Sequence, residues 1–113
     1  RAGLRLDEAL AHARRAALLD PSQNRFYRDT IGWVLHRMGK SKEALAEVMT
    51  SLHQIETQNA SSFAEVLWHA AEIRRALGQM DEASEAYRQA VLYDPAGAYG
   101  RKARRALLER PTW

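Results

Sequence analysis

Two segments of this chain match each other in register around a glycine. Residues 35–44 read LHRMGKSKEA and residues 74–83 read RRALGQMDEA, which aligns Gly39 with Gly78. A third, partial copy begins with LDEA at residue 6 and shares a closing Asp-Pro pair with the last copy. Three copies in a chain of 113 residues predict a repeat architecture, in which neighbouring units bury one another's apolar faces.

The residues around each glycine predict a pair of short helices. Ile31, Leu35 and Met38 follow the spacing of one helical face. Gly39 stands where a helix end favours a residue that tolerates the left-handed conformation, and Gly32 is small enough for a close helix crossing. No stretch alternates in the way a strand would. We therefore expect an all-α chain with helices at 6–19, 25–38, 42–56, 63–77, 81–93 and 98–109.

These segments resemble the tetratricopeptide repeat (TPR), a helix-turn-helix unit of about 34 residues. The family's packing positions fall on Ile31, Gly32, Leu35, Gly39, Ala44, Val48 and Ser51 in one copy and on Leu67, Ala70, Ala71, Gly78, Ala83, Tyr87, Ala90 and Pro95 in the other. The resemblance implies a right-handed superhelical stack of antiparallel helix pairs in a single domain, residues 1–113. Its parts would be a half repeat at 6–21, full repeats at 25–58 and 63–95, and a capping helix at 98–110. The middle repeat lacks the closing proline and is longer, and we expect its extra residues at 54–62.

Each first helix also has a second face, which in this family lines the concave groove that receives partner peptides. A tryptophan among charged neighbours is typical of a binding hot spot, so Trp33 and Trp68 are the expected anchors for one extended ligand. The candidate groove residues are Phe26, Asp29, Trp33, His36 and Arg37 in the middle repeat and Glu65, Trp68, Glu72 and Arg75 in the last. The alternative is that both indoles fill the interior between repeats. The family's Lys/Asn/Arg clamp for acidic tails is absent, and Glu65 and Glu72 would discourage such ligands.

Several kinds of chemistry are excluded or disfavoured. The chain has no cysteine, which excludes disulfides and thiolate chemistry. We find no nucleophile elbow, phosphate loop or paired acid and base, and so predict no catalytic residue, no cofactor and no enzyme. Glu65, His69 and Glu72 could place three metal ligands on one helix face, but no second cluster completes a site. We predict no metal.

The expected partner is a protein or peptide, bound by a scaffold module of a longer protein; the chain begins with Arg1 instead of Met. The alternative is self-association through the helix from Leu6 to Leu19, whose apolar stripe lacks a preceding helix. Basic residues gather at 101–105, but no aromatic side chains are interleaved with them, which disfavours nucleic acid. No apolar run is long enough to span a bilayer. The sequence does not distinguish cytoplasm from periplasm.

Overall fold

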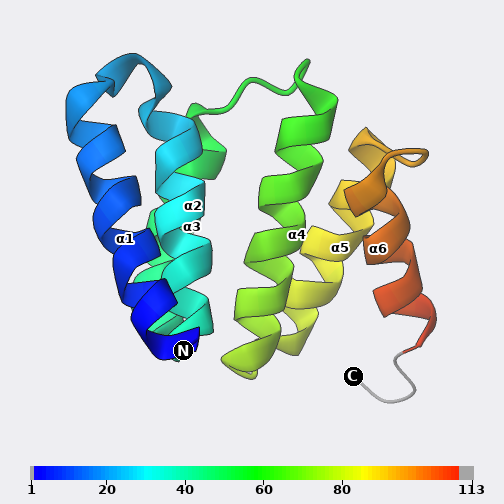
Figure 1. The fold of residues 1–113 in the computed structure, drawn as a ribbon. Coiled ribbons are helices and arrows are strands. Elements are labelled where there is room, and N and C mark those ends of the chain that lie inside the picture. Colours follow the sequence, from blue (N-terminus) through cyan, green and yellow to red (C-terminus); the bar gives the residue numbers. More distant parts are fainter. Residues whose placement is uncertain (1, 110–113) are drawn as a thin grey trace. The chain divides into compact units, whose positions relative to one another are not determined.

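The computed structural model describes residues 2–109, and within them it contains helices and no strand (Figure 1). This confirms the all-α fold class. The α-helices are α1 (Ala2–Leu19), α2 (Asn24–Arg37), α3 (Ser41–Gln54), α4 (Ala60–Ala76), α5 (Met80–Tyr93) and α6 (Ala98–Leu108). A short 3₁₀ helix, η1 (Pro21–Gln23), joins α1 to α2.

Contacts between residues group these helices into two compact units, Arg1–Gln54 and Ile55–Trp113. In the first unit, α2 packs against both α1 and α3. In the second unit, α4 and α5 pair as a hairpin, and α6 packs against both of them. Each unit therefore contains one helical hairpin of the kind that the sequence predicts, together with one further helix.

The two aligned glycines adopt the conformation expected at the end of a helix. Gly39 has φ 85° and Gly78 has φ 79°, both in the left-handed region. The Lys40 N–H donates to the Leu35 carbonyl at 2.9 Å, and the Gln79 N–H donates to the Arg74 carbonyl at 2.8 Å. These bonds close the helix in the Schellman pattern, which a glycine at this position favours. The repeat in the sequence is thus a repeat of backbone geometry.

Proline ends the helix before it in both places where Asp-Pro occurs. Asp20 has φ −137° and ψ 74°, and Asp94 has φ −147° and ψ 67°. A proline ring excludes helical backbone at the residue before it, because its Cδ collides with that residue. The α1 and α5 helices accordingly end one residue earlier, at Leu19 and Tyr93.

Mostly small side chains, together with Tyr87, are buried where the two helices of each hairpin cross. The fully buried residues at the two crossings are Ala44, Val48 and Ser51 in the first unit and Ala71, Ala83, Tyr87 and Ala90 in the second. Ser51 is the one polar side chain among the small residues of this set, and its Oγ donates a hydrogen bond to the Arg25 carbonyl. A buried serine is tolerated here because its polar atom is satisfied.

The connection between α3 and α4 differs from one expectation. The sequence predicts a helix at 63–77, which would start α4 after Ser62. In the structure α4 begins at Ala60, Asn59 is its N-cap, and no side chain caps it. The Phe63 N–H donates to the Asn59 carbonyl at 2.9 Å, so the helical ladder extends nearly one turn further back. The extra residues of the middle copy form a loop at 55–59.

Candidate functional site

The candidate groove residues divide between the two units. Five of them come from α2 of the first unit, namely Phe26, Asp29, Trp33, His36 and Arg37. Four come from α4 of the second unit, namely Glu65, Trp68, Glu72 and Arg75. Their geometry is described separately for each unit.

On α2, Trp33 and His36 form an aromatic pair with ring centroids 5.1 Å apart, and both side chains are partly exposed. His36 Nδ1 lies 3.1 Å from the hydroxyl of Ser41, the first residue of α3. This contact ties the ring to the second helix of the hairpin and restricts its orientation. Phe26 lies about two helical turns before Trp33, with the Arg25 guanidinium 4.6 Å from the centre of its ring. Arg37 is exposed, whereas Asp29 is buried.

On α4, Trp68 belongs to a cluster that includes two residues of α6. The Trp68 ring lies 5.6 Å from the His69 ring and 5.5 Å from the Tyr99 ring. The Lys102 ammonium lies 5.0 Å from the centre of the Trp68 ring and 4.9 Å from that of Tyr99. A cation over two aromatic faces is attracted by both ring quadrupoles. We call Trp68, His69, Tyr99 and Lys102 the Trp68 patch.

Sequence reasoning did not find the α6 half of this patch. The sequence pattern places Lys102 among the basic residues at 101–105 and gives Tyr99 no role. A usable signal was present, because Tyr99 and Lys102 are three residues apart and therefore share one helix face. Their meeting with Trp68 could not be read from spacing, since it depends on how α6 packs against α4. Lys102, in the basic segment at 101–105, therefore gains an aromatic neighbour, Trp68, through the packing of α6 against α4.

Glu72 of α4 is engaged inside the hairpin. Its Oε2 accepts a hydrogen bond from the hydroxyl of Tyr87, a fully buried residue of α5. Burial, followed by the neighbouring Glu72 carboxylate, raises the pKa of Tyr87 above its usual value of 10.0, while Arg75 acts in the opposite direction. Glu72 therefore holds α4 to α5, a structural role that the groove assignment did not anticipate.

This arrangement predicts a loss of stability at alkaline pH. Because the pKa of Tyr87 is higher in the folded protein than in the unfolded chain, its contribution is complete below pH 10.0 and decreases as the pH rises further. We expect the free energy of unfolding of the second unit to fall by up to about 1.4 kcal/mol per pH unit in that range. Urea unfolding at a series of pH values measures it. Tyr87→Phe should remove this fall, and the exposed control Tyr93→Phe should keep it; equal slopes in both variants would contradict the assignment.

Comparison with known families identifies the second unit's hairpin. A family model described as tetratricopeptide repeat matches residues 64–96, which cover most of α4, all of α5 and Pro95. Residues 64–96 are a tetratricopeptide repeat. No curated protein and no solved structure matches the chain.

The TPR assignment gives the site its general meaning. Repeats of this kind serve as protein-interaction or scaffold modules and are typically not catalytic. Trp68 lies within the matched repeat, and Tyr99 and Lys102 follow it on α6. No helix among residues 2–109 is long and apolar enough to cross a membrane.

Proposed function

We propose that this chain is a protein-interaction module that binds a peptide or helix of a partner on the groove faces of α2 and α4. The observation that supports it most is the Trp68 patch, a partly exposed indole beside Tyr99 and Lys102 within and next to the TPR. Peptide segments bind such surfaces through a few aromatic and cationic anchors. Trp33 and His36 supply a second aromatic pair on α2.

The proposal extends to the repeat organisation. The α2–α3 hairpin has the same left-handed glycine turn and buried crossing as the matched repeat. We propose that residues 25–58 are a second, longer TPR, that 6–21 is the second half of another, and that 98–110 is a capping helix. The α6 helix then completes the groove face of the last repeat as well as covering its core.

Removing both tryptophans tests the proposed groove. A Trp33→Ala, Trp68→Ala double variant should lose most binding to a partner identified with the wild-type chain, while its circular dichroism spectrum stays helical. If the indoles instead fill the interior, each substitution should cost about 3–5 kcal/mol of stability. Leu108→Ala, which truncates an exposed residue, is the control and should change neither quantity.

Thermal unfolding measured beside partner affinity separates these outcomes. Weak binding with an unchanged melting temperature supports the groove. A lowered melting temperature supports the alternative that the two indoles fill the interior. A double variant that stays folded and binds normally would contradict both, and the binding surface would then lie elsewhere on the chain.

A second function is favoured by one observation at the end of α1. Leu18 and Leu19 are 82% and 77% exposed, and the stripe formed by Leu6, Ala9 and Leu10 is only partly covered. Apolar surface of this kind favours association, so α1 could join two copies of the chain. Sedimentation velocity of the wild type against Leu18→Ser, Leu19→Ser decides, because a wild type that is monomeric at all concentrations excludes this function.

A further inference from the structure

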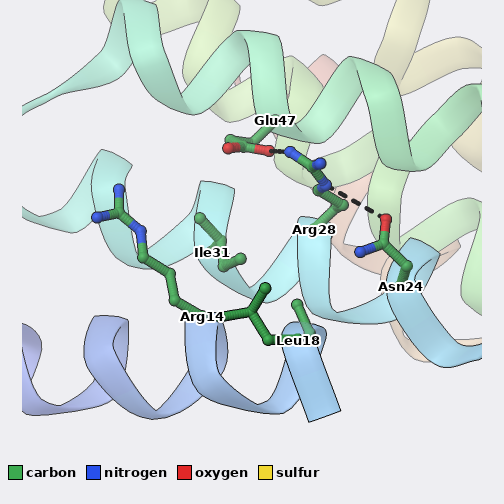
Figure 2. Close-up of a pocket in the computed structure, with 7 residues that line it drawn as sticks. Arg14, Leu18, Asn24, Arg28, Ile31 and Glu47 are labelled. Carbon is green, nitrogen blue, oxygen red and sulfur yellow. Dashed lines mark hydrogen bonds and ion pairs between the residues drawn. The ribbon is translucent and has the colours of Figure 1, made fainter. Parts of the chain in front are cut away.

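The first unit contains a pocket of about 310 Å³. The residues of α2 that line it lie on a different side of the helix from the candidate groove residues. The pocket is lined by Arg14, Ala17 and Leu18 of α1, by Asn24, Arg28 and Ile31 of α2, and by Glu47 of α3 (Figure 2). The three α2 residues follow one another at steps of four and three, whereas Phe26, Trp33 and His36 lie on a separate stripe. The pocket is therefore a surface that the groove proposal does not use.

An arginine lines this pocket at a position that is apolar in the matched repeat. Aligning Gly39 with Gly78 places Arg28 over Leu67, which is 2% exposed. Arg28 instead directs its guanidinium toward α3, where Nη1 donates to Glu47 Oε2 at 2.7 Å, while Nε donates to Asn24 Oδ1 at 3.3 Å. Its polar head forms one wall of the pocket, which Ile31 also lines (Figure 2).

The charges of the pocket are not balanced. Glu47 is already paired with Arg28, as the dashed line in Figure 2 shows. Arg14 reaches in from α1 and has no hydrogen bond or ion pair within the part of the chain that the structure describes. The lining thus carries two arginines against one carboxylate. An anionic group placed between Arg14 and the Arg28–Glu47 pair would satisfy the remaining cation through charge-assisted hydrogen bonds.

We propose that this pocket binds a segment of a partner protein that carries a large aliphatic side chain next to a carboxylate. The aliphatic group would contact Ala17, Leu18 and Ile31, and the carboxylate would pair with Arg14. A protein segment fits better than a small amphiphile, because Leu18 lines the pocket and is still 82% exposed, so its outer side offers apolar surface that a longer segment would cover. The surface is independent of the Trp68 patch, so either proposal can fail without the other.

The test uses a labelled helical peptide of about 15 residues, made of Ala, Leu and Glu, with Leu and Glu on one face. Fluorescence anisotropy measures its binding to the whole chain. Arg14→Glu and Leu18→Ser should each weaken it at least about tenfold. The neighbours Arg15 and Leu19 are exposed but do not line the pocket, so Arg15→Glu and Leu19→Ser are matched controls that should change binding less than about twofold.

A charge swap makes the test specific. A second peptide, with Lys in place of Glu, should bind the wild type poorly and should recover affinity for Arg14→Glu. Trp68→Ala should leave binding of the Glu peptide unchanged, which separates this pocket from the groove. Melting curves confirm that each variant is folded.

Four results would overturn the proposal. The first is that the wild type does not bind the Glu peptide at concentrations up to about 1 mM, and the second is that the pocket variants and the control variants change binding equally. The third is that only Trp68→Ala loses binding, and the fourth is that the chain binds decanoate but not the peptide. A concentration-dependent dimer that Leu18→Ser abolishes, with no peptide binding, would show that a second copy of the chain is the occupant instead.

Discussion

Replacing Gly32 with leucine is expected to lower the free energy of unfolding of the first unit by about 1–3 kcal/mol or more. A Cβ at this position would collide with Val48 Cγ2 and would lie 3.0 Å from the Ala44 carbonyl oxygen. The backbone of α3 cannot move aside as a flexible side chain can, so the α2–α3 hairpin must open or rotate. Chemical denaturation measures the loss, and amide exchange should locate it in α2 and α3.

Gly39 provides the control for this substitution. It lies in the same hairpin, but nothing stands within 4 Å of the position that its Cβ would take. Gly39→Asn keeps a residue that tolerates the left-handed conformation and should cost less than about 1 kcal/mol. If Gly32→Leu were no more destabilising than Gly39→Asn, the close crossing of α2 and α3 would be wrong.

The second large effect is expected at Gly100, in the first turn of α6. A Cβ there would collide with the carbonyl oxygen of Asp94 and would lie 3.2 Å from the Pro95 Cα, so even alanine requires the backbone to shift. We expect Gly100→Ala to cost about 1–3 kcal/mol and to detach α6 from α4 and α5. Trp68 would then lose Tyr99 and Lys102, which a red shift of its fluorescence and faster amide exchange in α6 should report.

Gly97→Ala tests whether the effect at Gly100 arises because the added Cβ meets backbone atoms and not a side chain. A Cβ on Gly97 would also meet Asp94, but it would meet the side-chain carboxylate, which can rotate away. Gly97→Ala should therefore keep α6 in place and leave the Trp68 fluorescence near that of the wild type. Equal losses in the two variants would mean that the loop before α6 tolerates no side chain, whatever it contacts.

The two tryptophans and Glu72 show which features of the candidate site could be predicted from helical spacing and which could not. Trp33 and Trp68 were selected because helical spacing places them off the packing stripe, and both are partly exposed, as a binding anchor needs to be. Glu72 was selected by the same spacing, yet its carboxylate bonds to buried Tyr87. Spacing assigns a residue to a face of its own helix. It does not say whether a long side chain at the edge of that face turns toward solvent or toward the neighbouring helix.

Local rules were sufficient to predict from the sequence the presence of helices α1 to α6, the two glycine turns and the stops before Pro21 and Pro95, but not the starts of α1 and α4. Each of these depends on steric limits within a few consecutive residues, and so the same residues give the same geometry in both copies. The small residues at the crossings were predictable for a related reason, because two helices approach closely only where side chains are small.

Only the tertiary structure decided which distant side chains meet. Lys102 lies over Trp68 because α6 packs on α4, Tyr87 reaches Glu72 across the α4–α5 hairpin, and Arg28 turns to Glu47 on α3. These partners are 34, 15 and 19 residues apart in the chain. Their contacts depend on the packing of whole helices and on the rotamers that this packing allows, and neither is contained in the periodicity of one segment.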